Sequence, residues 1–348
     1  MGGGQNTRKI NPLFKDIKEY NKYLLSLIGI FVLLLTGIIS YNYTNTSYAK
    51  WSSSVESKNI LKISVKNKDY ALKFAEDNVG TDGLEEVTHE IDNTLQVDER
   101  FATEYRYRGG DTTVNNYVTF NNEVWRIIGI IPTEDTNGNV ENRFKIIKNE
   151  SVADNGIKGT YWNENHTNNW IEATLNTYLN NDYYNTLTTD AKNMIGTTKY
   201  YLGGYSESNI TSDVMWQYER KNEANRTGYY YGTNPIMQND ASKKIAIMYA
   251  SDYGYATLKE CTVDFNNYIG STSCKPPNIW LWLHYTMWLL TPESDNGIRA
   301  FYLSNYGPGC YYDVNYDGPK VYPVLSLSSN VKISGGSGTS SDPYQLSV

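Results

Sequence analysis

A group of aromatic and polar side chains suited to binding a ligand lies between Tyr302 and Tyr316. Its sequence, YLSNYGPGCYYDVNY, combines tyrosines, asparagines and an aspartate with glycine and proline. Tyrosine supplies rigid contact area with a hydroxyl, and asparagine supplies adaptable hydrogen bonds. Glycine and proline shape loops, which often carry binding residues. The predicted ligand-binding residues are Tyr302, Asn305, Tyr306, Tyr311, Tyr312, Asp313, Asn315, Tyr316 and Asp317.

The abundance of tyrosine also has an explanation unrelated to binding. The chain contains 32 tyrosines and only 8 phenylalanines. An AT-rich genome favours tyrosine, asparagine, lysine and isoleucine codons and would produce this bias everywhere. The alternative interpretation of residues 302–317 is therefore a surface hairpin of biased composition.

The three cysteines all lie in the C-terminal third of the chain. Cys261 and Cys274 flank a polar loop, and in an exported domain such a pair is best explained as a structural disulfide. Cys310 is then expected to remain a single thiol.

Metal sites and acid–base sites have little support in the sequence. His89, His166 and His284 lack the spacing of metal ligands, so each is expected to be an ordinary packed or surface residue. Residues 313–318 begin like an EF-hand calcium loop, but Val324 stands where the bidentate glutamate is required. No combination of serine, histidine and aspartate suggests a hydrolase. We therefore expect no catalysis, no cofactor and no metal.

The overall charge argues against a nucleic-acid partner. The formal net charge is −7, and positive residues form no extended basic patch. Proteins that bind nucleic acids neutralise phosphates with clustered lysine and arginine. We expect no binding of nucleic acid.

The N-terminal region predicts a single membrane anchor. Residues 23–41 form an apolar run of about 19 residues without a charge, close to the length that spans a bilayer as a helix. Five lysines and arginines precede it, and the first positive residue after it is Lys50. This asymmetry predicts a cytoplasmic segment 1–22 and an extracellular C-terminus. The alternative is secretion after cleavage of a signal peptide near Ala49.

The remaining sequence predicts an α+β domain with antiparallel sheets. Residues 42–103 are expected to form a stalk and a partly helical connector, because Leu84, Val87, Ile91 and Leu95 are spaced as in a helix. The ectodomain is expected to span residues 104–332, and residues 333–348 a terminal hairpin or tail. Within the ectodomain we expect a helix over 170–187 and strands over 117–120, 124–131, 144–147, 244–249, 288–290, 300–303 and 321–327.

Several motifs occur in an order that resembles a family of exported Firmicutes surface proteins. The motifs are NNWIEATLNTYLNNDYYNTL (168–187), KIAIMYASDYGYA (244–256), MWLLTP (287–292) and KVYPVL (320–325). The resemblance covers about residues 104–332. It implies a C-type-lectin-like domain, related to that of formylglycine-generating enzymes. Tyr322 stands where the family has arginine, so the bracing of the loop above the sheet that the arginine would provide is not expected here. Some receptors with this fold have sequences that retroelements diversify. In those receptors the segment that corresponds to residues 302–317 carries the variable ligand contacts, so the resemblance implies a binding role for it.

These observations lead to two hypotheses for the function. The first is a membrane-anchored cell-surface binding protein or adhesin that recognises an extracellular protein or glycan through residues 302–317. The second is a structural envelope or appendage component without a dedicated ligand, and an oxidase-like enzyme of the same fold is a distant third. An exposed patch of tyrosine and asparagine would favour the first hypothesis.

Overall fold

The computed structural model describes most of the chain beyond residue 68. The described residues are 20–25, 27–28, 33–36, 69–152, 161–206, 209–221, 236–237, 244–281, 286–304 and 307–348, without the side chains of 236–237, 310 and 311. The chain divides into two units, Met1–Val65 and Lys66–Val348. Among the described residues, no helix has both the length and the hydrophobicity needed to cross a bilayer. Most of the predicted anchor, 23–41, lies outside these residues.

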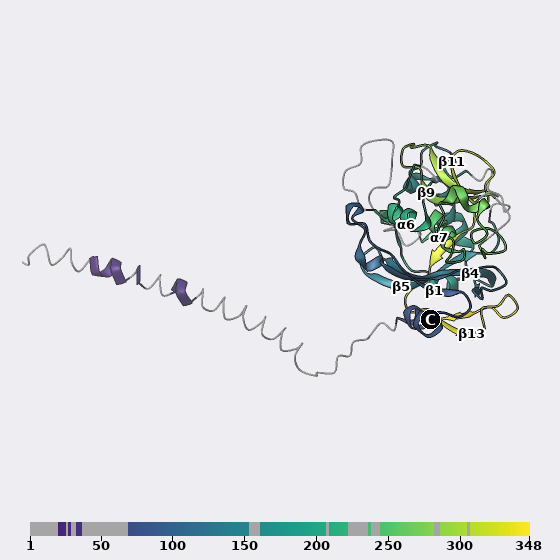
Figure 1. Ribbon diagram of the computed structural model, residues 1–348. Coiled ribbons are helices and arrows are strands. Elements are labelled where there is room, and N and C mark those ends of the chain that lie inside the picture. The colour runs from purple at the N-terminus through teal and green to yellow at the C-terminus, as the bar shows by residue number, and fades with distance from the viewer. Residues whose placement is uncertain are drawn as a thin grey trace, which may run out of the picture. The chain divides into compact units, whose positions relative to one another are not determined.

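A seven-stranded antiparallel sheet organises the second unit (Figure 1). The strand order is β1-β2-β4-β5-β12-β8, and β3 also pairs with β4. Its strands are β1 (Leu84–Thr88), β2 (Thr103–Tyr107), β3 (Tyr117–Phe120), β4 (Glu123–Glu134), β5 (Val140–Lys148), β8 (Ile245–Ala246) and β12 (Val324–Ser326). The predicted α+β class with antiparallel sheet is therefore confirmed.

The predicted hairpin at residues 117–131 is confirmed. Asn121 and Asn122 connect β3 to β4, and their φ angles are 55° and 59°. Two residues with positive φ match the tight turn that follows the natural twist of antiparallel strands, and asparagine tolerates this conformation. The local sequence therefore sets the pairing of β3 with β4.

Three smaller sheets complete the strands. One contains β9 (Met287–Pro292), β10 (Arg299–Ser304) and β11 (Gly307–Asp313) in the order β11-β10-β9, another pairs β6 (Lys199–Tyr200) with β7 (Ile236–Met237), and the last pairs β13 (Lys332–Gly335) with β14 (Gln345–Ser347). The β13–β14 pair is the predicted terminal hairpin. Backbone hydrogen bonds join its Tyr344 to Tyr117 and Thr119, so the tail is tied to β3.

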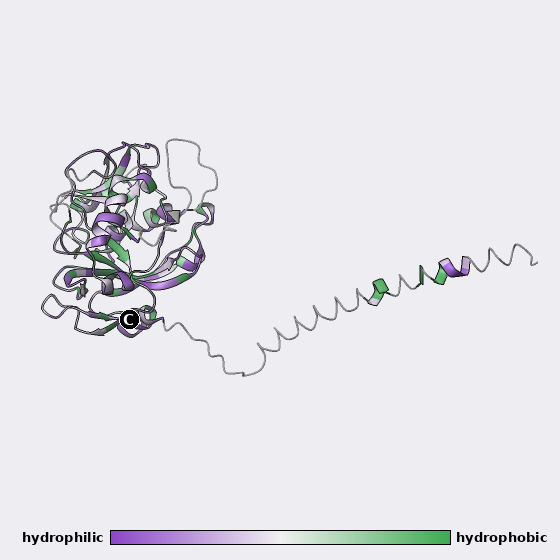
Figure 2. Ribbon diagram, turned by 180° about the vertical axis from the view of Figure 1, so that it is seen from behind, coloured by the Kyte–Doolittle hydropathy of each residue, from purple (hydrophilic) through white to green (hydrophobic). Residues whose placement is uncertain are grey.

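Short helices surround the sheets. They are α2 (Tyr70–Asn78), α3 (Thr174–Tyr178), a π-helical turn (Leu179–Tyr183), α4 (Tyr184–Thr186), α5 (Thr189–Met194), α6 (Ser212–Arg220) and α7 (Ala250–Tyr255), with 3-10 turns at Asn93–Leu95, Glu99–Phe101, Trp170–Glu172 and Phe265–Gly270. Trp125, Trp162, Trp170 and Trp288 are fully buried in the core. Figure 2 shows hydrophobic segments inside the folded unit and polar ribbons along its outside.

Three predicted elements differ from the structure. The helix expected from Leu84 to Leu95 is wrong, because β1 pairs with β2 and satisfies its backbone groups there. The helix expected over 170–187 is divided into short 3-10, α and π segments. Of the strand expected over 244–249, only Ile245–Ala246 pairs in the sheet, since Asn180 caps its backbone and α7 begins at Ala250.

Candidate functional site

Three tyrosines form an aromatic cluster on the small sheet, with Tyr312 and Tyr316 exposed and Tyr302 half-buried. Tyr302 lies on β10, Tyr312 on β11 and Tyr316 in the turn that follows. The rings of Tyr302 and Tyr312 meet edge to face with centroids 5.5 Å apart, and those of Tyr312 and Tyr316 are 4.1 Å apart. The exposed fractions of Tyr312 and Tyr316 are 40% and 44%. We call Tyr302, Tyr312 and Tyr316 the tyrosine platform.

Two glycines leave room for the rings of the platform. A Cβ atom added at Gly309 would lie 3.0 Å from the Tyr302 ring, and one at Gly318 would lie 3.1 Å from the Tyr316 ring. Gly309 is also the cross-strand partner of Tyr302. The rings therefore rest against backbone, which restricts their motion more than a solvent-exposed position normally does.

Charged groups border the platform. Arg299 is the cross-strand partner of Asp313, and its Nε donates to Asp313 Oδ1 at 2.9 Å. Glu293 Oε2 lies 4.0 Å from Arg299 Nη1, but that oxygen accepts no hydrogen bond from any residue that the structure describes. Burial raises the pKa of Glu293 to about 7, although Arg299 opposes the shift. The border thus combines an ion pair with a carboxyl group that titrates near neutral pH.

The structure describes six of the nine predicted ligand-binding residues. Besides the platform they are Asp313, Asn315 and Asp317, of which the last two are exposed. Val314 is buried and fixes the turn between them. Asn305, Tyr306 and the side chain of Tyr311 lie outside the described residues, although the Tyr311 backbone belongs to β11. The segment that the sequence suggested as a loop is therefore mostly a strand.

The predicted disulfide is present in the structure. The sulfur atoms of Cys261 and Cys274 are bonded at 2.01 Å. Both cysteines are buried, and the bond closes the loop that contains the 3-10 turn Phe265–Gly270. Cys310 lies on β11, but its side chain is outside the described residues.

A buried chain of ionic hydrogen bonds lies between the large sheet and helices α6 and α7. Lys145 Nζ donates to Asp252 Oδ2 at 2.5 Å, and Arg106 Nη1 donates to Asp252 Oδ1 at 2.8 Å. Arg106 Nε also donates to Glu104 Oε1 at 2.5 Å. The side chains of these four residues are at most 6% exposed. This ionic chain therefore joins β2 and β5 to α7 through opposite charges that compensate one another.

His89 extends this ionic chain to the surface. Its Nε2 lies 2.9 Å from Glu104 Oε1, and its Nδ1 lies 2.6 Å from Asp213 Oδ1 on α6. The ring stacks on Trp216 with centroids 3.6 Å apart. Burial acts to lower the pKa of His89, but the hydrogen bonds to Asp213 and Glu104 outweigh it and raise the pKa. His89 is thus a packed residue, as predicted, with a structural ionic role that the sequence did not reveal.

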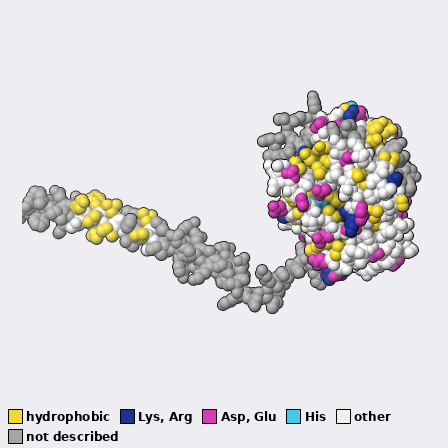
Figure 3. All heavy atoms as spheres, in the orientation of Figure 1, with side chains coloured by type: hydrophobic (Ala, Val, Ile, Leu, Met, Phe, Trp, Pro, Cys, Tyr) yellow, Lys and Arg dark blue, Asp and Glu magenta, His cyan; other side chains and the backbone are white. Residues whose placement is uncertain are grey.

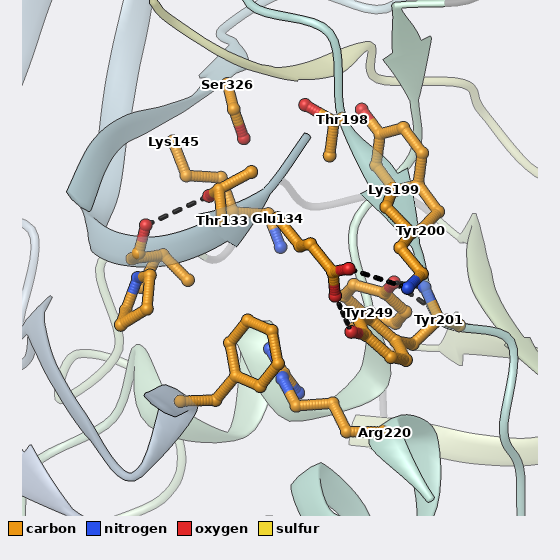
Figure 4. A pocket seen from close by; sticks show the side chains of 13 residues that line it. Thr133, Glu134, Lys145, Thr198, Lys199, Tyr200, Tyr201, Arg220, Tyr249 and Ser326 are labelled. Carbon is orange, nitrogen blue, oxygen red and sulfur yellow. Dashed lines mark hydrogen bonds and ion pairs between the residues drawn. The ribbon is translucent and has the colours of Figure 1, made fainter. Parts of the chain in front are cut away.

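A small cavity with both apolar and charged lining residues opens beside the inner end of this ionic chain. Its volume is about 40 Å³, and it is lined by residues of β4, β5, β6 and β12, by the C-terminal end of α6 and by Tyr249 just before α7. Figure 4 shows Lys145 and Arg220 entering it from different sides, while Glu134 points toward Lys199 and Tyr201. Sequence reasoning missed this cavity, because its lining residues come from distant segments.

Comparisons of the chain with known proteins found no similar protein. No protein-family model, no curated protein and no solved structure matches the chain. Within the described residues, no group of three or more histidine, cysteine, aspartate or glutamate side chains is arranged to hold a metal ion.

Proposed function

We propose that this chain is a membrane-anchored cell-surface binding protein, or adhesin, that recognises an extracellular glycan or protein through the tyrosine platform. The observation that carries the proposal is that Tyr312 and Tyr316 are exposed and that their rings contact each other at a tilt of 41°. Burying these rings against a ligand would remove apolar area from water.

The chemistry around the platform favours a glycan over an apolar protein surface. Flat aromatic rings stack on the C–H faces of sugars, and Asp313 with Asn315 supplies acceptors and donors for hydroxyl groups. On the face seen in Figure 3, hydrophobic side chains form only small separate patches among polar ones. Protein interfaces that depend on apolar contact need broader patches than these.

The rigid mounting of the rings also supports a binding role. Side chains that are already held in place lose less conformational entropy when a ligand binds. Gly309 and Gly318 bring the backbone against two of the rings, and the three rings contact one another. A ligand would therefore meet a preformed surface.

A glycan array probed with the purified chain tests the proposal. We expect binding to a defined glycan class that Tyr312→Ala or Tyr316→Ala weakens at least about tenfold, since single aromatic anchors often contribute over 1 kcal/mol. Tyr312→Phe should retain most of the affinity, because it keeps the ring. Ile171→Ala removes another exposed apolar side chain, 51% exposed and outside the platform, and should bind normally.

Two results would contradict the proposal. Unchanged binding by both tyrosine variants would place the contact surface elsewhere. Unfolding of both variants would show that the rings stabilise the hairpin, which would favour a structural role for the segment.

A further inference from the structure

The cavity between β4, β5, β6 and α6 is lined by more hydrogen-bond donors than acceptors. The carboxylate in its lining is Glu134, and both of its oxygens accept hydrogen bonds. Lys199 Nζ donates to Glu134 Oε1 at 2.7 Å, and the Tyr201 hydroxyl donates to Oε2. Tyr200 and Tyr249 donate their hydroxyls to the backbone oxygens of Lys244 and Tyr201. Each carboxylate oxygen of Glu134 thus already accepts a hydrogen bond from another residue of the lining.

Among the described residues of the lining, Arg220 has the most N–H groups that make no hydrogen bond. It lies at the end of α6 and is 6% exposed. Its Nη1 donates to the Trp216 carbonyl at 3.3 Å and lies 3.7 Å from Glu219 Oε2. Within the described residues its Nε and Nη2 atoms make no hydrogen bond. The Arg220 Cζ atom also lies 4.6 Å from the ring centroid of Trp216 and 5.4 Å from that of Tyr249. A largely buried guanidinium whose remaining N–H groups make no hydrogen bond favours an anionic partner in a fork geometry.

Other donors converge on the same space. Lys145 and Ser326 are cross-strand partners on β5 and β12, and both line the cavity. The Thr198 hydroxyl is buried and approaches Tyr200 without meeting hydrogen-bond geometry, so it has no partner in the described structure. Lys145 uses Asp252 as an acceptor, which leaves further ammonium hydrogens for the cavity.

The electrostatics agree with this count of donors. Burial lowers the pKa of Lys145, Asp252 opposes the shift, and the positive charges of Arg106 and Arg220 add to the lowering. Lys145 therefore sits where additional negative charge would be favourable. A buried donor without an acceptor, such as the Thr198 hydroxyl, destabilises the fold, so an occupant that accepts hydrogen bonds would stabilise it.

The size of the cavity limits the occupant. A cavity of about 40 Å³ holds roughly three water molecules. That is room for one compact planar group and not for a whole sugar or nucleotide. Glu134 at the cavity wall would repel a dianion more strongly than a monoanion.

We propose that this cavity is a binding site for the carboxylate group of a small organic acid or sugar acid, held by Arg220 with Lys145, Thr198 and Ser326. The guanidinium and the ammonium neutralise the carboxylate, and the two hydroxyls donate to its oxygens. None of these residues belongs to the tyrosine platform, so the site stands independently of the glycan-binding proposal.

Acetate serves as the probe for this site. The midpoint of thermal unfolding of the purified full-length chain is measured at increasing concentrations of sodium acetate. Sodium acetate replaces sodium chloride, so the ionic strength stays constant. We expect a saturable rise in the midpoint, because a ligand that binds only the folded state stabilises it. Inorganic phosphate provides the second arm and is expected to give a smaller rise.

Matched variants assign the effect to the cavity. Arg220→Gln should weaken acetate binding about tenfold or more, because it removes a charge-assisted pair. Lys221→Gln removes the same charge one residue away, at a side chain outside the lining, and should bind acetate normally. If Arg220→Gln fails to fold, Thr198→Val keeps the shape of the side chain and should still weaken binding about threefold or more.

Several outcomes would overturn the proposal. They are an acetate effect no larger than that of chloride, a phosphate effect larger than that of acetate, and equal acetate binding by the wild-type protein and Thr198→Val. None of these results depends on the tyrosine platform.

Discussion

At the scale of single residues, Glu293 beside the tyrosine platform makes the stability of the fold depend on pH. This carboxyl group is 5% exposed, and burial raises its pKa to about 7. The folded state therefore holds a proton that the unfolded state releases near its ordinary pKa of 4.5. Between these two values the folded state binds more protons, so its stability falls as pH rises from about 4.5 to about 7.

Glu293→Gln should remove this pH dependence. We expect the variant to be more stable than the wild-type protein by roughly 1–3 kcal/mol at about pH 8, and nearly equal to it at about pH 4. Chemical denaturation at a series of pH values measures the difference. Glu172→Gln changes an exposed carboxyl group and serves as the control. A parallel pH profile for wild type and Glu293→Gln would refute the assignment.

Arg106 is the residue on which the buried ionic chain depends most. It bridges Glu104 and Asp252, and both carboxyl groups have lowered pKa values because Arg106 and its neighbours outweigh the effect of burial. Removing one member of a buried network leaves its partners without compensation.

Arg106→Met should therefore destabilise the fold by about 3–5 kcal/mol, as measured by urea unfolding. Arg100→Met is the matched control, because Arg100 pairs with Asp98 at the surface, where its side chain is 51% exposed. An exposed pair of this kind contributes at most about 1 kcal/mol. Equal losses from the two substitutions would show that the buried chain is no more important than a surface pair.

At the scale of secondary-structure elements, the β3–β4 hairpin offers a test of its turn. Asn121 and Asn122 both have positive φ, but their side chains differ in role. Asn121 Oδ1 accepts a hydrogen bond from the Thr188 backbone N–H at 2.8 Å. No side-chain hydrogen bond of Asn122 occurs within the described part of the chain.

Asn122→Gly should stabilise the protein by roughly 0.5–1 kcal/mol, since Asn-Gly is the preferred pair for this turn. Asn121→Gly relieves the same backbone conformation but loses the bond to Thr188, so it should be neutral or destabilising. Thermal unfolding of the two variants compares them directly. A loss of stability in Asn122→Gly would mean that the asparagine side chain has a role beyond the turn.

The hairpin also shows which elements the sequence predicts well. Its turn residues and alternating strands lie within one short segment, so local chemistry is enough to place it. The spacing of Leu84, Val87 and Ile91 is equally local, but the pairing of β1 with β2 overrides it. In the same way, a helix over 170–187 was predicted from one apolar face, whereas the backbone changes from 3-10 to α and π geometry.

The two candidate sites also differ in how local their residues are in the sequence. The platform comes from neighbouring strands of one hairpin, and its exposed tyrosines stand out in the sequence. The ionic chain and the cavity bring together residues that are distant along the chain, such as Arg106 with Asp252 at a separation of 146 residues. A single sequence contains no signal for such pairs, because each member looks like an ordinary surface charge.

At the scale of the whole molecule, the predicted topology has a direct consequence for protease access. The charge asymmetry around residues 23–41 predicts that the chain crosses the membrane once, with the unit Lys66–Val348 outside the cell. Protease treatment of intact cells should then remove a C-terminal epitope tag and leave an N-terminal tag protected. Cells opened by osmotic lysis before treatment should lose both tags, which controls for intrinsic resistance to the protease. Full protection of the C-terminal tag in intact cells would reject this orientation, and recovery of the folded unit in the medium without protease would instead support cleavage near Ala49.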